Sequence, residues 1–336
     1  MAKRAPSHTQ LDLFAAPGEA EPKPLVAPAP ADAYLTRVSQ QLAASIYLGT
    51  SSWSFPGWRG LVYAADAPKT KLARHGLAAY ARHPLLRAVG VDRTYYAPIT
   101  ADDFAAYAET VPETFRFLVK AHELCTLPFF HASGRYAQRG GERNERFLEP
   151  GYATDQVVAP CVEGLGAKAG PILFQFSPQP LPAVGGAERF AQRLHAFLER
   201  LPRGPLYAVE LRNAELFTAA YCAALADTGA VHCFNVHPSM PLVHEQLRLA
   251  DSATGAALVV RWMLHPTQRY ATARDRYEPF NRLVDEDPES RNTIAAMCLE
   301  AAAAGRPAMV IANNKAEGSS PLTVCKLAER IVQEME

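Results

Sequence analysis

The chain has 336 residues, of which 49% are hydrophobic and 20% are charged, a composition that excludes disorder of the whole chain. The 34 Lys and Arg residues balance the 34 Asp and Glu residues. This balance excludes the overall basic field of a protein that coats nucleic acid, although it leaves room for a local basic groove. The six cysteines lie far apart without a C-x-x-C pair, and no apolar stretch approaches the roughly 18 residues of a membrane span. We therefore expect a cytoplasmic protein that has reduced cysteines and does not enter a membrane.

The first 45 residues are expected to form a disordered arm and a short lead-in helix. Residues 15–33 consist largely of Ala and Pro, which supply little apolar bulk for a core, so residues 1–33 are predicted to be a tail and residues 34–45 the helix. The tail holds one apolar cluster, formed by Gln10, Leu11, Asp12, Leu13 and Phe14. This cluster resembles Q-L-[S/D]-L-F, the motif by which bacterial DNA polymerases and repair proteins dock on the sliding clamp. The alternative is an incidental apolar patch.

Residues 46–336 are expected to form a single (β/α)₈ barrel of the TIM type. Eight compact apolar runs predict buried parallel strands, and stretches with helical spacing separate them. The strands are expected at 46–51, 88–96, 115–121, 171–177, 206–212, 230–236, 257–263 and 308–314, and the helices at 70–83, 102–110, 155–168, 187–200, 214–227, 290–304 and 320–335. An open doubly wound sheet is the main rival, but no G-x-G-x-x-G helix start follows Gly49, which favours the barrel.

The connection after the third strand, residues 122–154, is longer than an ordinary βα loop. It holds Gly134, Gly140 and Gly141 among Arg and Glu residues. This composition is compatible with a lid or binding loop and equally with a tolerated surface insertion.

Polar residues at the carboxyl ends of the strands are the candidates for the site, because that end of a TIM barrel carries the active site. Glu210 and Arg212 lie two apart on one strand and therefore project to the same face, where Lys120 and Arg261 would add positive charge. Several cations around one carboxylate suit a phosphate or carboxylate ligand. Glu210 is then the candidate general base, and Lys120 and Asp92 are the other candidate catalytic residues. The alternative for Glu210 and Arg212 is a structural ion pair.

Aromatic residues gather at the ends of the first two strands. Tyr95 and Tyr96 follow the second strand and Trp53 follows the first, where their rings could stack on a base or a sugar. For Trp58 and Tyr63, which lie in the same region, packing in a hydrophobic lid is an equal alternative.

The ten histidines show no H-E-x-x-H or other tight metal-ligand spacing. Only His122, Asp92, Glu210 and His237 could converge through the fold. The sequence therefore favours a site without a bound divalent metal.

Six runs spread along the chain resemble a known family in its own order. They are GTSSW (49–53), PGWRGLVY (56–63), FRFLVK (115–120), GPILFQFSP (170–178), YAVELR (207–212) and NNKAEGSSP (313–321). The family is the YecE-like family, also called domain of unknown function seventy-two. The resemblance implies a (β/α)₈ barrel distantly like those of xylose isomerase and endonuclease IV, without a settled activity.

The resemblance also singles out site residues and shows one departure. The family pattern points to Trp53, Tyr96, Lys120, Gln175, Glu210, Arg212, Asn313 and Asn314. Where the family has V-E-x-N-x-T-F-Y, this chain has VGVDRTYY (89–96), so Gly90 stands at the acidic position and Asp92 at the Asn position. A mechanism that needs that glutamate cannot operate here.

These observations favour a barrel that binds or processes a phosphate-containing ligand. Nucleic acid is the favoured ligand, because recruitment to a sliding clamp serves DNA metabolism better than sugar metabolism. Hydrolase-like, nuclease-like and isomerase-like activities all remain open. The alternatives are an enzyme acting on a small sugar or sugar phosphate and a non-catalytic binding module.

Overall fold

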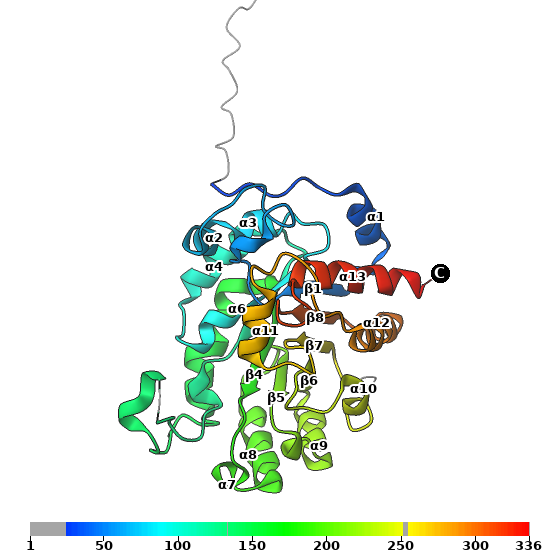
Figure 1. Cartoon of the computed structure of the whole chain (residues 1–336). Coiled ribbons are helices and arrows are strands. Elements are labelled where there is room, and N and C mark those ends of the chain that lie inside the picture. Colours follow the sequence, from blue (N-terminus) through cyan, green and yellow to red (C-terminus); the bar gives the residue numbers. More distant parts are fainter. Residues whose placement is uncertain (1–24, 133, 251–254, 336) are drawn as a thin grey trace, which may run out of the picture.

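Eight parallel strands close into a barrel in sequence order, which confirms the predicted fold. The structure is a computed structural model that describes residues 25–132, 134–250 and 255–335 (Figure 1). The strands are β1 (Ile46–Thr50), β2 (Ala88–Val91), β3 (Arg116–Lys120), β4 (Ala169–Phe176), β5 (Tyr207–Leu211), β6 (Val231–Val236), β7 (Leu258–Trp262) and β8 (Ala308–Ala312). The pairing of β1 with β8 over five residues closes the barrel.

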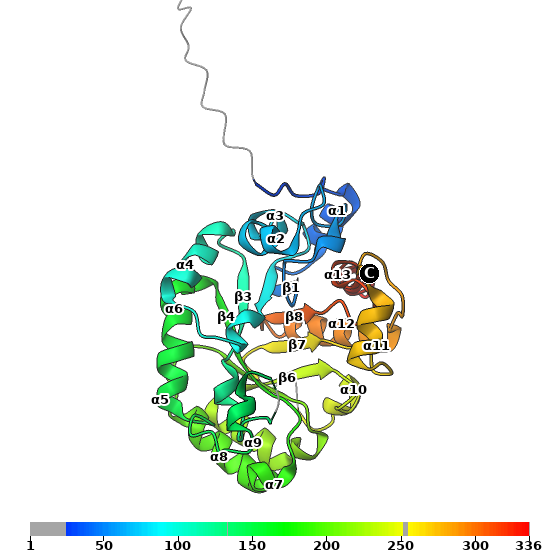
Figure 2. The ribbon, with the colours of Figure 1, turned by 60° about the vertical axis from the view of Figure 1, so that its left-hand side comes forward.

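The helices lie around the outside of the strands (Figure 2). They are α1 (Ala33–Gln41), α2 (Lys69–His75), α3 (Leu77–Tyr80), α4 (Ala101–Thr110), α5 (Pro150–Ala153), α6 (Ala159–Leu165), α7 (Leu181–Val184), α8 (Ala187–Glu199), α9 (Ala219–Thr228), α10 (Val243–Gln246), α11 (Tyr270–Tyr277), α12 (Pro288–Ala303) and α13 (Ser320–Gln333). Helix α8 shows why they pack there, since it buries Phe190, Leu194 and Phe197 along one face. In the described part of the chain, no helix has both the length and the apolar character needed to cross a bilayer.

Alternation along the strands places polar side chains inside one end of the barrel. Successive side chains of a strand point to opposite faces, so every second residue points inward. The inward positions at mid-strand are apolar and form a buried cluster that includes Leu118, Leu173, Ala208, Val259 and Ile311. Two residues further along, the inward positions are Lys120, Gln175, Glu210, Arg261 and Asn313. We call this end, with the loops that follow the strands, the barrel mouth.

The second strand is shorter than its sequence suggests. A strand is expected over 88–96, but β2 ends at Val91 and a 3₁₀ turn spans Asp92–Tyr95. The Thr94 hydroxyl lies 2.7 Å from the carbonyl of Val91 and 2.6 Å from that of Lys120, and this pair of contacts fixes the turn against β3. The turn brings Asp92 and Tyr95 to the barrel mouth.

Residues 25–32, which the composition assigns to the tail, lie against the first loop of the barrel. Val26 is buried, and the Ala29 amide donates to the carbonyl of Val62 at 2.9 Å. Asp32 caps α1 by accepting from the Tyr34 amide at 2.7 Å. Helix α1 in turn packs beside α13 (Figure 1). The cluster at residues 10–14 lies outside the described residues.

Candidate functional site

Glu210 holds two guanidinium groups inside the barrel mouth. It is fully buried at the end of β5, where one carboxylate oxygen accepts from Arg212 Nε at 2.7 Å and the other from Arg261 Nη1 at 2.6 Å. Burial opposes the charge of Glu210, but the two guanidiniums outweigh this effect and lower the pKa of the carboxyl to about 2. So low a pKa makes Glu210 a weak proton acceptor, and its contacts position Arg212 and Arg261.

Asp92 is the second carboxylate of the mouth, and it is the more accessible one. Its two oxygens accept from Arg261 Nη2 at 3.1 and 3.2 Å, and a third of its side chain is exposed. Gly90, two residues earlier, has no side chain to offer Arg261, and a Cβ there would meet the Cα of Ser51 at 3.3 Å. Asp92 is therefore the second carboxylate that pairs with Arg261, and it lies nearer the opening of the mouth than Glu210 does.

Two lysines add positive charge that no carboxylate neutralises by direct contact. Lys120 ends β3, and its Nζ lies 3.5 Å from the centre of the Tyr95 ring. Lys315 follows β8, and its Nζ lies 4.5 Å from the centre of the Tyr270 ring. Both lysines are 8% exposed, and burial lowers the pKa of each to about 8. Within the described residues, neither ammonium group has a hydrogen bond or an ion pair.

These six residues form the mouth cluster. Its members are Asp92, Lys120, Glu210, Arg212, Arg261 and Lys315. Four cations face two carboxylates, so the fully ionised cluster carries an excess of two positive charges. Gln175 adds an amide oxygen 3.3 Å from Arg261 Nη1. An excess of buried positive charge calls for an anionic partner.

The predicted aromatic residues separate into two groups. Tyr95 and Tyr96 lie at the mouth with their rings edge to face, and 57% of Tyr96 is exposed. Trp53 is buried beneath the first loop, where it packs edge to face on Tyr107 and donates to the carbonyl of Ala73. The structure thus does not bring Trp53 into the mouth cluster. Trp58 and Tyr63 are buried, as expected if they pack in a hydrophobic lid and do not contact a ligand.

The two predicted asparagines also differ. Asn313 donates to the Ser51 hydroxyl at 2.8 Å and accepts from the Lys315 amide at 3.0 Å, so it lies beside the cluster. Asn314 is buried and accepts from the amide and the hydroxyl of Ser320, both at 2.8 Å. Asn314 therefore fixes the start of α13 rather than facing a ligand.

The sequence prediction missed two residues beside the cluster. Tyr270 begins α11, in the connection between β7 and α12, where no helix is expected from the sequence. Arg135 lies in the segment between β3 and α5 and donates to the carbonyl of Tyr96. The only sequence feature that pointed to Arg135 was its place in a long loop. No sequence feature pointed to Tyr270.

Metal binding has no obvious centre in the described part of the chain. Within residues 25–132, 134–250 and 255–335, no group of three His, Cys, Asp or Glu side chains could hold an ion. His122 lies 2.6 Å from the Tyr152 hydroxyl, and His237 lies 2.8 Å from the Ser239 hydroxyl. Both imidazoles thus have hydrogen-bonding partners of their own.

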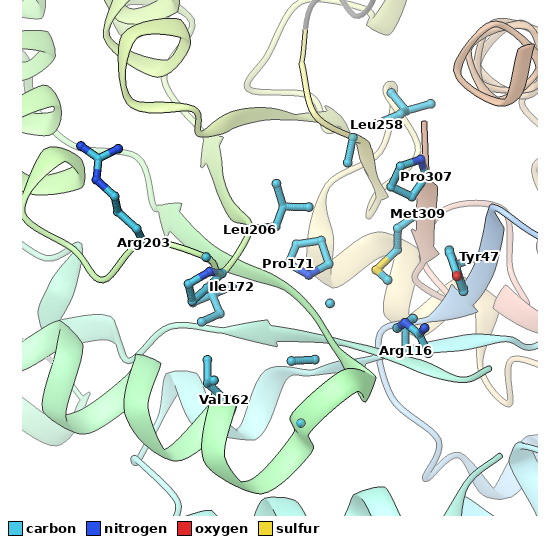
Figure 3. Close-up of a pocket in the computed structure, with 16 residues that line it drawn as sticks. Tyr47, Arg116, Val162, Pro171, Ile172, Arg203, Leu206, Leu258, Pro307 and Met309 are labelled. Carbon is cyan, nitrogen blue, oxygen red and sulfur yellow. The ribbon is translucent and has the colours of Figure 1, made fainter. Parts of the chain in front are cut away.

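A cavity of about 520 Å³ lies at the other end of the barrel (Figure 3). Its walls come from the amino ends of the strands and include Pro171, Leu206 and Met309. Its Arg116 lies 5.5 Å from the Tyr47 ring and donates to nearby carbonyls, so it is already engaged. This cavity could hold a small ligand, but the uncompensated charge lies at the mouth, where TIM barrels carry their chemistry. We therefore assign the candidate site to the mouth.

Comparisons with known proteins agree with the fold. A DUF72 family protein of Enterococcus faecalis V583 has a similar structure, with a TM-score of 0.56, 18% identity, and 85% of this chain and 95% of that chain covered. A DUF72 family protein of Thermotoga maritima MSB8 gives a TM-score of 0.56 and 18% identity over 86% of this chain and 99% of that chain. No curated protein matches significantly. The family model described as "protein of unknown function DUF72" matches residues 47–336, so this chain belongs to the DUF72 family, as the order of its motifs predicts.

Proposed function

We propose that the barrel mouth binds a phosphate-containing ligand, with nucleic acid as the favoured class. The observation that carries this proposal is the pair of buried lysines, Lys120 and Lys315, which have no anionic contact within the described residues. A phosphate group accepts hydrogen bonds from lysine and arginine together, and it would balance the excess charge of the cluster.

Exposed aromatic rings beside the cluster support a ligand with a base or a sugar. Tyr96 and Tyr270 are 57% and 62% exposed, and Tyr270 is in contact with Lys315. Bases stack on such rings with little regard to sequence, while lysines contact the backbone phosphates. A sugar phosphate would use the same groups, so it is the second candidate ligand.

The arm favours nucleic acid over a sugar phosphate. Gln10, Leu13 and Phe14 resemble a sliding-clamp motif, and short motifs of this kind bind a partner through a few anchoring side chains. We propose that the arm docks on the clamp through these residues, with Leu13 and Phe14 filling an apolar pocket. A metabolic enzyme would gain little from such recruitment.

Binding measurements test the ligand. Fluorescence anisotropy with labelled single-stranded DNA and with an abasic-site duplex, and thermal shifts with sugar phosphates, are to be run over a range of salt concentrations. Lys315→Met is expected to weaken DNA binding about tenfold and to reduce its salt dependence. Arg203→Met, which removes a cation beside the opposite cavity, is the matched control and should change neither. Stabilisation by a sugar phosphate without any response to DNA would favour the second candidate.

The clamp proposal needs a separate measurement. A labelled peptide spanning residues 5–18 is titrated with a purified bacterial sliding clamp, and binding in the micromolar range is expected. The double variant Leu13→Ala/Phe14→Ala should lose binding. Equal binding by the double variant, or no binding by either peptide, would remove this support for a role in DNA metabolism.

A further inference from the structure

We propose that Lys120 forms an imine with an aldehyde group on the ligand of the barrel mouth. This inference rests on the proposed function, because the phosphate of the ligand would hold its carbonyl carbon near the amine. The substrate class is an aldehyde that carries a phosphate, such as an abasic deoxyribose in DNA or an aldose phosphate.

The position of Lys120 supports this chemistry. Its side chain is 8% exposed, points into the mouth from the end of β3, and has no hydrogen bond or ion pair in the described part of the chain. A lysine that only balances buried charge would be expected to touch a carboxylate, yet the nearby oxygens of Glu210 and Asp92 are occupied by Arg212 and Arg261. Lysines desolvated beside other cations are the ones that proteins use as amine nucleophiles.

The charge state of Lys120 is compatible with nucleophilic attack. Burial is the largest effect and lowers the pKa of the ammonium to about 8, with Arg261 and Arg212 acting in the same direction against Asp92 and Glu210. At pH 7.5 about a quarter of such lysines are neutral, against about 0.1% at the ordinary pKa. The Tyr95 ring, whose centre lies 3.5 Å from Nζ, favours the ammonium form.

The covalent step needs no oxidant or reductant. The nitrogen lone pair attacks the aldehyde carbon, and the C–O π electrons move to oxygen, which takes a proton and becomes the hydroxyl of a carbinolamine. The nitrogen loses a proton, the hydroxyl leaves as water after a second proton arrives, and a C=N bond remains. Solvent at the mouth, where a third of the Asp92 side chain is exposed, can supply and take up these protons. Hydrolysis reverses the step and frees the enzyme.

Lys315 is the matched comparison because it has a similar pKa and burial. Both ammonium groups lie over a tyrosine ring, but Lys315 follows β8, whereas Lys120 projects inward from β3 beside the two guanidiniums of the cluster. We therefore assign the amine to Lys120 and charge balance alone to Lys315.

Reductive trapping tests this assignment. The full-length protein is incubated with cyanoborohydride and either an abasic-site duplex or glyceraldehyde 3-phosphate, and the adduct is located by peptide mass mapping. The native chain and Lys71→Arg, a change at an exposed position of α2 outside the mouth cluster, are expected to form the adduct on Lys120. Lys120→Arg, which keeps the charge, should lose at least tenfold in yield. The trapping rate should rise with pH and level off below pH 10.5, the ordinary pKa of lysine. Mapping of the native adduct gives the answer even if Lys120→Arg does not fold.

The outcomes separate this inference from the proposed function. An adduct on another lysine, or an equal yield with Lys120→Arg, overturns the imine. Absence of an adduct overturns it as well. If no adduct forms but anisotropy still shows DNA or phosphate binding, the proposed function stands without the imine. If anisotropy shows no binding either, the imine and the proposed function are both wrong.

Discussion

A buried carboxylate in this barrel positions other groups and is not free to act on a ligand. Both oxygens of Glu210 accept hydrogen bonds from guanidiniums, so the carboxylate is already engaged by Arg212 and Arg261. Arg212 and Arg261 lose their main counter-charge if Glu210 becomes neutral, since only Asp92 remains close to Arg261. Removal of one partner from a buried ion pair leaves the other charge buried and unpaired. The protein then loses more stability than the intact pair contributes.

Glu210→Gln is therefore expected to lower the free energy of unfolding by about 3 kcal/mol and to weaken phosphate binding by displacing both guanidiniums. Urea denaturation and anisotropy check the two effects on the same preparation. Glu113→Gln, which removes an exposed carboxylate paired with Lys168, is the control and should change stability by less than about 1 kcal/mol. A Glu210→Gln protein of native stability and unchanged affinity would contradict the positioning role.

The two lysines make ligand affinity depend on pH. Their pKa values of about 8 mean that the mouth loses positive charge as the pH rises through 8, so affinity for a phosphodiester should fall above that point. A bound anion favours the ammonium and raises the pKa of both groups, so binding at about pH 8.5 should take up protons. Calorimetry in two buffers of different ionisation enthalpy measures this uptake. Affinity that stays constant from pH 7 to 10 would show that the lysines do not contact the ligand.

At the scale of elements, the segment between β3 and α5, residues 121–149, is folded and in contact with the mouth. Asn144 is buried and donates to the carbonyls of Leu124 and Leu127 at 2.8 and 2.6 Å, which holds the base of the segment. Part of the segment projects from the body of the molecule (Figure 1). Arg135 reaches back to Glu123 at 3.2 Å and to the carbonyl of Tyr96. These contacts suit a lid whose closed position Arg135 stabilises.

Arg135→Ala tests the lid against a surface insertion. We expect phosphate-ligand dissociation to accelerate several-fold, because the segment loses its contacts with Tyr96 and Glu123. The melting temperature should hardly change, since the side chain of Arg135 is 42% exposed and such pairs contribute about 1 kcal/mol or less. Stopped-flow release of labelled DNA measures the rate, with Arg143→Ala in the same segment as the control. Equal release rates would favour a simple insertion.

The elements that the sequence predicts well are those fixed by local pattern. All eight strands and the inward positions of Lys120, Gln175, Glu210 and Arg261 follow from alternation and from the polar end of each apolar run. The end of β2 could not be predicted in this way, because it depends on the contact of Thr94 with the carbonyl of Lys120, which lies far away in the sequence. The burial of Trp53 depends in the same way on Tyr107 of α4. Composition and periodicity carry no information about such long-range partners.

At the scale of the whole molecule, residues 25–32 join the arm to the barrel through contacts with the first loop and α1. Deletion of residues 1–24 should leave the melting temperature nearly unchanged, because the Ala- and Pro-rich composition of residues 15–24 supplies little apolar bulk for a core. Deletion of residues 1–32 should lower it by several degrees, since it removes buried Val26, the hydrogen bond from Ala29 to Val62, and the cap of α1 at Asp32. Calorimetry measures the melting temperature of both truncated proteins. Equal melting temperatures would show that residues 25–32 add no stability.

Three histidines, one buried and two partly buried, should make the whole fold sensitive to mild acid. Burial lowers the pKa of His83, His232 and His237 to about 4 each, against about 6.5 in an unfolded chain. Between these values the unfolded chain binds more protons than the folded one, so stability is present above about pH 6.5 and is lost as the pH falls toward 4. Near pH 5, His83 and His232 together should remove about 2 to 2.5 kcal/mol per pH unit, and the more exposed His237 should add a smaller amount.

Urea denaturation from pH 7 to pH 4.5 measures this slope. His83→Asn removes one of the two larger contributions and should reduce the slope by about 1 kcal/mol per pH unit. Replacement of the exposed His75 by Asn should leave the slope unchanged. Glu210 acts in the same direction at lower pH, because its pKa of about 2 makes its contribution to stability disappear below about pH 4.5. A free energy of unfolding that stays level between pH 6.5 and 4.5 would mean that these imidazoles reach water in the folded protein.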